Sequence, residues 1–87
     1  FSVSPNPFKN STEVMIELAD DDYVKVQVFD RSGRMVKELE NRVHNAAYHK
    51  IIWDGTDLNG QKLNPGVYFI IAETSGEVFT EKVIVLQ

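Results

Sequence analysis

Apolar and polar residues alternate one by one in several short runs of this chain, and this period of two constrains the fold more than any other feature. The clearest run is residues 23–29, in which Val24, Val26 and Val28 alternate with polar or aromatic side chains. Successive side chains of a β-strand point to opposite faces, so each run predicts a strand with one buried face. No stretch has the 3.6-residue period of an amphipathic helix. The predicted strands are residues 1–3, 12–18, 23–29, 34–39, 48–53, 67–74 and 78–86.

Turn-forming residues separate these runs. Asp30–Gly33 is typical of a hairpin turn, in which the Asp side chain bonds the backbone and Gly33 accepts a positive φ. Residues 54–66 hold three glycines and a proline, which indicates turns, and residues 41–47 lack a pattern and are predicted to be a loop. Strands separated by turns every ~8–12 residues are typical of a sandwich. We therefore predict an all-β, immunoglobulin-like antiparallel β-sandwich of about seven strands, as one domain over residues 1–87.

Composition excludes several classes of function. The chain has no Cys, so it forms no disulfide and no thiolate metal site. Its 13 acidic residues outnumber 9 Lys and Arg that form no cluster, so no nucleic-acid partner is expected. The longest apolar run, residues 67–72, is shorter than the ~20 residues of a transmembrane segment. Phe1 is not a start methionine and no signal peptide follows it, so we expect a piece of a larger protein, with further domains upstream and its native end at Gln87.

The residues that could carry metal or acid–base chemistry favour structural roles. Asp54, Asp57 and Asn59 offer oxygen donors on a Gly-rich loop, as Ca²⁺ requires, but they lack the spacing and the bidentate Glu of an EF-hand. We expect them to cap turns, with no metal and no cofactor bound. His44 and His49 have no serine nucleophile to complete a triad, so we expect exposed histidines and no enzyme activity.

Aromatic residues suggest a core and leave one alternative open. Trp53 carries the largest apolar area of the chain and is predicted to pack between the sheets. Tyr68 can bury its ring while its hydroxyl reaches a partner. Small β-sandwiches can bind sugars on exposed rings, so Tyr48 and Phe69, together with these two residues, keep a carbohydrate-binding module as an alternative.

The two last predicted strands are apolar on both faces. Residues 67–72 contain no polar side chain, and residues 83–86 repeat the pattern. A sheet of a two-layer sandwich buries only one of its faces in the core. The second face must therefore be covered by loops, by a neighbouring domain or by an external partner.

Four local patterns carry a family resemblance. They are SPNPF at residues 4–8, DRSGRMV at 30–36, WDGTDLNG at 53–60 and LNPGVY at 63–68. In this order they resemble the C-terminal sorting domain of proteins exported by the bacterial type IX secretion system, and the related immunoglobulin-like domain of the flagellar hook-cap protein. The residues that match these motifs, and that we expect to shape the fold, are Pro5, Asn6, Pro7, Phe8, Gly33, Arg34, Trp53, Asp54 and Gly55.

The resemblance implies a non-catalytic secretion signal. Such a domain crosses the periplasm, docks on the outer-membrane type IX translocon and reaches the outer membrane, the cell surface or the extracellular space. Sortase components cut cargo upstream of the domain, whereas retained surface components keep it. The alternative is a structural immunoglobulin-like module of an extracellular assembly.

The expected docking element is the terminal hairpin, offered as a surface or as a strand for edge addition. Many members of the family have a basic residue near the terminus, whereas the last charged side chain here is Lys82. The residues expected to bind the partner are Leu63, Pro65, Gly66, Tyr68, Ile70, Lys82, Val83, Val85, Leu86 and Gln87.

Overall fold

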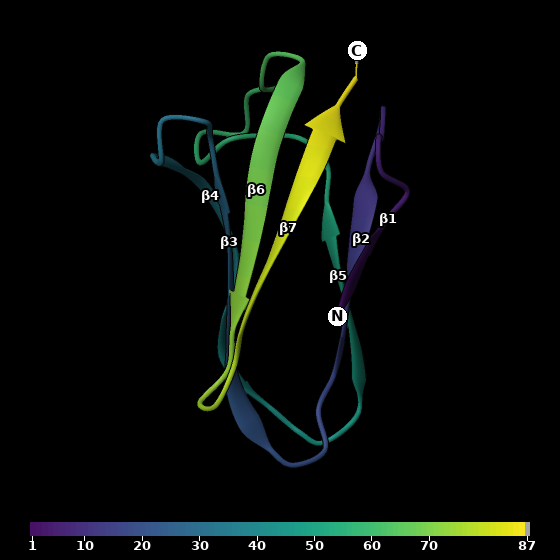
Figure 1. The fold of residues 1–87 in the computed structure, drawn as a ribbon, viewed down its shortest axis with the longest axis vertical. Coiled ribbons are helices and arrows are strands. Elements are labelled where there is room, and N and C mark those ends of the chain that lie inside the picture. The colour runs from purple at the N-terminus through teal and green to yellow at the C-terminus, as the bar shows by residue number, and fades with distance from the viewer. Residues whose placement is uncertain (87) are drawn as a thin grey trace.

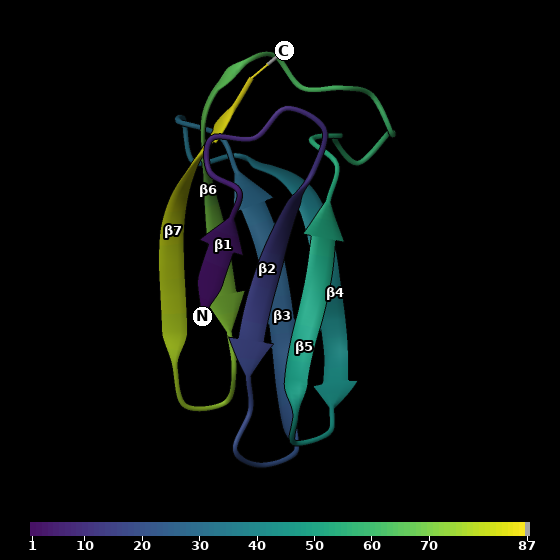
Figure 2. The same cartoon turned by 90° about the vertical axis from the view of Figure 1, so that its right-hand side faces the viewer.

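Two antiparallel sheets pack face to face in the computed structural model, which describes residues 1–86 (Figure 1). Figure 2 shows the three-stranded sheet, of order β1-β2-β5, in front of the four-stranded sheet, of order β4-β3-β6-β7. None of the elements formed by residues 1–86 is a helix that could span a membrane. The prediction of an all-β sandwich is confirmed. The strands are β1 (Ser2–Ser4), β2 (Thr12–Glu17), β3 (Asp22–Phe29), β4 (Met35–His44), β5 (Tyr48–Trp53), β6 (Gly66–Glu73) and β7 (Val78–Val85).

The core lies between the sheets and consists of the faces that alternation predicts. Val24, Val26 and Val28 of β3 are fully buried, while Lys25 and Gln27 between them are half-buried on the outer face. The same holds for β2, where Val14 and Ile16 are buried, while Glu13 and Met15 are half-buried on the outer face. The buried apolar residues are Phe8, Val14, Ile16, Leu18, Val24, Val26, Val28, Val36, Ile51, Trp53, Tyr68, Ile70, Ala72, Val83 and Val85.

Strand β4 is longer than predicted, since it continues to His44 through residues that we expected to form a loop. Its pairing with β3 shifts twice, because Val26 pairs with Glu40 and Gln27 with Glu38, and a second shift follows towards Phe29. The first shift leaves Leu39 as an extra residue. An extra residue in one strand reverses the inward and outward positions that follow it. The period of two is therefore lost in the sequence although the strand continues.

The hairpin turn between β3 and β4 forms as predicted. The Asp30 carboxylate accepts hydrogen bonds from the backbone N–H groups of Ser32, at 2.9 Å, and Arg34, at 3.0 Å, and from the Ser32 hydroxyl. Gly33 has a φ of +89°, a conformation that other residues rarely adopt. The hydrogen bond from the Ser32 hydroxyl is the main reason why the pKa of Asp30 lies below its ordinary value.

Candidate docking surface

The β6–β7 hairpin has one face in the core and one face towards the outside. Tyr68, Ile70 and Ala72 of β6 lie in the core, as do Val83 and Val85 of β7. The alternate residues of the outer face remain partly exposed, and the register places them side by side. The outer face thus carries an apolar band that residues 1–86 cover only in part. Its members are Phe29, Val67, Phe69, Ile71 and Ile84.

The ten residues expected to bind a partner fall into three groups. Leu63, Pro65 and Gly66 lie in or at the end of the segment that leads into β6, and they are half-buried or exposed. Lys82 is exposed on β7, and Leu86 is exposed beyond its end. Gln87 lies outside the described residues. The remaining four are core residues whose side chains are covered by the sandwich itself: Tyr68, Ile70, Val83 and Val85.

The turns and the end of β7 meet at one end of the sandwich, at the top of Figure 1. We call this the loop end and define it as residues 9–11, 30–34 and 54–65 together with Leu86. Leu58 and Leu86 are 60% and 45% exposed there. Three shallow hollows open on it, of about 180, 300 and 300 Å³. Their combined lining includes apolar and cationic side chains, namely Lys9, Arg31, Arg34, Leu58, Lys62, Leu63 and Leu86.

The acidic residues of the long loop are used by its own turns. Asp54 accepts hydrogen bonds from the backbone and the hydroxyl of Thr56, and the hydroxyl contact is the main cause of its lowered pKa. Asp57 accepts from the backbone N–H groups of Asn59, at 2.9 Å, and Gln61, at 3.0 Å. Residues 1–86 hold no group of three or more acidic or histidine side chains placed to bind a metal ion. Asp54 and Asp57 therefore cap turns of the loop, as predicted.

An aromatic cluster closes the core below the loop end. Trp53 is 1% exposed, its ring lies 5.3 Å from that of Phe8 and 6.1 Å from that of Tyr68, and its indole N–H donates to the Thr56 carbonyl. The Tyr68 hydroxyl donates to the Asn64 carbonyl at 2.7 Å, and burial raises the pKa of this tyrosine. Of the four rings considered for sugar binding, only Tyr48 is exposed, since Phe69 is half-buried and the other two lie in the core. Tyr48 is therefore the one exposed ring among the four that could support the carbohydrate-binding alternative.

Asn6, between two prolines, covers part of the free edge of β7. Its side-chain amide donates to the Lys82 carbonyl at 2.7 Å and accepts from the Ile84 N–H at 3.0 Å, as a neighbouring strand would. Phe8 continues this contact, donating to the Ile84 carbonyl at 3.0 Å and accepting from the Leu86 N–H at 2.8 Å. The sequence motifs predicted that Asn6 and Phe8 shape the fold, but not that they pair with β7. Half of the β7 edge is therefore already paired.

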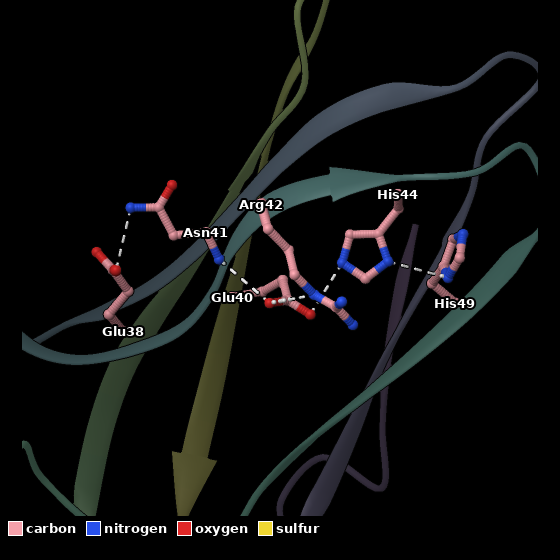
Figure 3. A network of polar contacts seen from close by, with 6 residues as sticks. All are labelled: Glu38, Glu40, Asn41, Arg42, His44 and His49. Carbon is pink, nitrogen blue, oxygen red and sulfur yellow. Dashed lines mark hydrogen bonds and ion pairs between the residues drawn. The ribbon is translucent and has the colours of Figure 1, made fainter.

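The two histidines, predicted to be exposed, are not equivalent. His44 is only 9% exposed, because the loop that we predicted around it is strand, and its Nδ1 lies 3.2 Å from Nδ1 of His49 (Figure 3). His49 is half-buried, and its Nε2 donates to the Asn45 carbonyl at 2.7 Å, so its Nδ1 is the acceptor for His44. The Glu40 carboxylate lies 2.9 Å from Nε2 of His44, the distance of an ion pair when the imidazole is protonated (Figure 3). This chain of contacts links β4 of one sheet to β5 of the other.

Comparison with known proteins gives the family. Residues 2–86 match the secretion system C-terminal sorting domain, and the chain belongs to this family. No curated protein sequence matches the chain. The four motifs that suggested the resemblance thus indicated the family correctly.

Solved structures show the same fold within larger proteins. The chain is similar over 98% of its length to dimeric latent PorU from Porphyromonas gingivalis, with 26% identity and a TM-score of 0.80, but this covers 9% of that chain. PorZ, a surface component of the type IX secretion system of the same organism, matches 99% of this chain and 11% of its own, with 15% identity and a TM-score of 0.70. FlgD from Xanthomonas campestris, a flagellar hook-capping protein, matches 91% of this chain and 58% of its own, with 25% identity and a TM-score of 0.66.

Proposed function

We propose that this domain is a non-catalytic sorting signal that docks on the type IX translocon and directs an attached protein across the outer membrane. The observation that carries the proposal is the convergence of the four family motifs on one end of the sandwich. Phe8 bonds Leu86, Gly55 and Leu63 line the same hollow as Leu86, and Leu63 also lines the hollow beside Arg34. Motifs spread over the chain thus contribute to one continuous surface.

The proposed docking surface is the loop end together with the outer face of the β6–β7 hairpin. Leu63, Pro65, Gly66, Lys82 and Leu86 contribute to it directly. The four core residues of the predicted set act by holding the hairpin in place. Asn6 and Phe8 already pair with half of the β7 edge. Docking through this surface is therefore favoured over the addition of a partner strand beside β7.

The proposed route follows that of the family. The attached protein crosses the periplasm, this domain docks at the outer membrane, and the protein reaches the cell surface or the extracellular space. If the protein is cargo, sortase components cut it upstream of Phe1; if it is a component of the system, the domain stays in place. Domains of the parent protein upstream of Phe1 are partners in either case.

A reporter-export assay with surface variants tests this proposal. Removing residues 82–87 would delete Val83 and Val85 from the core and confuse misfolding with loss of docking. The double variant Leu58→Ser, Leu86→Ser instead changes only exposed side chains of the loop end. If each leucine contributes ~1 kcal/mol to docking, losing both lowers the affinity about 30-fold. Reporters fused to residues 1–87 should therefore be exported by a type IX-competent strain, and the double variant should be retained.

The matched control is Val43→Ser, which changes a side chain that is 67% exposed on β4, at the end of the sandwich opposite the loop end. It should be exported like the unmodified domain, and thermal melts should be alike for all three proteins. Equal export of the double variant and the unmodified domain would contradict the proposed surface. No export of any fusion would contradict the sorting role itself.

A second candidate function is that of a structural module in an extracellular assembly. The similarity to FlgD favours it, because this chain covers more than half of that hook-capping protein. Such a module predicts no export of the reporter, with or without the loop-end leucines. The same assay therefore separates the two functions.

A further inference from the structure

The two sheets have four edge strands, and three of them are protected against pairing with another chain. Strand β1 is three residues long. Strand β4 has two register shifts and carries charged residues along its length, and β7 is partly covered by Asn6 and Phe8. Short length, irregular pairing, charge and coverage are the usual means by which proteins block their sheet edges. The fourth edge, β5, has none of these except one lysine.

The outer edge of β5 is regular and unpaired. All six of its residues pair with β2 without a register shift, from Tyr48 opposite Glu17 to Trp53 opposite Thr12. Within residues 1–86 no hydrogen bond outside this pairing reaches a backbone group of β5. Alternate N–H and C=O groups of an edge strand point away from its sheet, so this edge offers a template for a further strand.

The side chains on the outer face of β5 define what could lie beside them. Tyr48 and Ile52 are 68% and 59% exposed, and Lys50 lies between them. The Lys50 ammonium lies 3.7 Å from the Glu13 carboxylate on β2, and it is more than half exposed, which leaves it open to a second acidic partner. Along the strand, the outer face therefore presents an apolar side chain, a cationic one and a second apolar one. Residues directly opposite across strands interact most strongly, and opposite charges there are favourable.

Self-pairing is disfavoured by the same lysine. If β5 pairs with β5 of a second copy in the antiparallel register centred on Lys50, which aligns residues 48–52, Tyr48 lies opposite Ile52 of that copy, and the two Lys50 side chains lie opposite one another. Like charges directly opposite each other destabilise a strand pair. Lys50 thus disfavours this pairing with a second copy of the chain, while it leaves the edge suited to a strand that is acidic at its centre.

We propose that the outer edge of β5 is a strand-addition site for an extended segment of a partner protein, with an acidic side chain opposite Lys50 and apolar side chains opposite Tyr48 and Ile52. The partner's backbone hydrogen-bonds to β5, and its alternate side chains provide the specificity. The site goes beyond the sorting function and does not depend on it, because it lies on the three-stranded sheet and is measured on the domain alone.

The test attaches a probe strand to the domain. The probe Val-Thr-Glu-Thr-Val follows Gln87 through a flexible Gly/Ser linker of about 15 residues, which spans ~20 Å and gives an effective concentration in the millimolar range. A second probe has Lys in place of Glu. Amide hydrogen exchange is then measured by NMR for every strand. In the unmodified domain, the Glu probe should slow the exchange of alternate β5 amides about two- to fivefold more than the Lys probe.

Charge reversal provides the decisive comparison. In Lys50→Glu the preference should reverse to the Lys probe, and in Lys50→Gln the two probes should act alike. The matched control Lys82→Glu changes an exposed lysine of β7 and should keep the preference for the Glu probe. The proposal is overturned if neither probe slows exchange in β5, if exchange slows in β4 or β7 instead, or if the preference does not follow residue 50. None of these outcomes bears on export, which the reporter assay measures separately.

Discussion

The two long sides of the sandwich are closed in different ways. On the β1/β7 side, Asn6 and Phe8 bond the backbone of β7, and the Phe8 ring enters the core. On the β4/β5 side, the sheets are joined by polar side chains: His44 contacts His49 near one end, and Lys37 donates to the Thr56 hydroxyl and the Asp57 carbonyl at the other. The first side combines strand-like pairing with apolar burial. The second relies on polar links and leaves the edge of β5 open between them.

The side of the sandwich that contributes more to stability is thus not the side that has an unpaired strand edge. Burial of a large aromatic ring contributes several kcal/mol, whereas a partly exposed polar contact contributes about 1 kcal/mol or less. The side that holds the terminal strand is therefore the stronger one. The weaker side is the one with an unpaired strand edge.

The largest expected effect is that of Phe8→Ala, which tests the stronger side. The Phe8 ring is 2% exposed and packs against Trp53, so its loss should lower the free energy of unfolding by about 3–5 kcal/mol. Urea denaturation followed by tryptophan fluorescence measures this directly. Tyr48→Ala, on the exposed face of β5, is the control and should change stability by less than ~1 kcal/mol. Similar losses for the two variants would contradict the comparison.

Asn6→Ala should have the next largest effect. It removes both side-chain hydrogen bonds to the β7 backbone, and we expect a loss of about 1–3 kcal/mol together with faster amide exchange at Ile84. Asn6→Asp is the matched variant, because a carboxylate still accepts from the Ile84 N–H but cannot donate to the Lys82 carbonyl. The Asn6→Asp variant should therefore speed the amide exchange of Ile84 less than the alanine variant does. Unchanged exchange at Ile84 in Asn6→Ala would show that the side chain does not cover the edge.

Sequence reasoning succeeded where local pattern and burial agree. The valines of β3 and the aliphatic residues of β2 lie on regular strands, so a period of two identified their buried faces. Trp53 was assigned to the core because its apolar area could be buried nowhere else in so small a domain. Of the residues expected to bind a partner, Ile70 and Val83 lie in the core, because the same alternation that buries them leaves Phe69 and Ile84 on the outer face of the proposed docking surface.

What sequence reasoning missed depends on contacts between distant residues. The register shift at Leu39 is a property of the pairing with β3 and interrupts the alternation within β4, so the sequence predicted a loop over residues 41–47, of which residues 41–44 belong to the strand. Asn6 replaces a backbone group for residues that lie 76 and 78 positions further along the chain. No local pattern records such a contact. The exposed edge of β5 likewise follows from which strands are neighbours, which alternation does not specify.

On the weaker side, His49→Ala should cost about 1 kcal/mol, less than Asn6→Ala, since it removes the hydrogen-bond acceptor of His44 without opening the apolar core. Guanidinium denaturation of both variants under the same conditions gives the ranking. In His49→Asn a shorter polar side chain replaces the imidazole. It should recover part of the loss if a hydrogen-bond acceptor for His44 is what stabilises the contact between β4 and β5. A loss for His49→Ala that exceeds that of Asn6→Ala would reverse the order of the two sides.

The smallest effect concerns acid, which should weaken the β4/β5 side selectively. At its upper end Lys37 bonds the Thr56 hydroxyl, which in turn bonds the Asp54 carboxylate, and this hydroxyl contact is the main reason why the pKa of Asp54 lies below its ordinary value. A carboxyl group whose pKa is lower in the folded state contributes stability above its unfolded pKa and loses it as the pH falls through the folded value. The free energy of unfolding should therefore fall less steeply below about pH 4 in Asp54→Asn than in the unmodified domain, while Asn6→Ala, which removes no charge, should keep the unmodified slope. Equal slopes in Asp54→Asn and the unmodified domain would mean that this link carries no measurable part of the acid sensitivity, because the carboxyl is largely exposed and its interactions are screened by water.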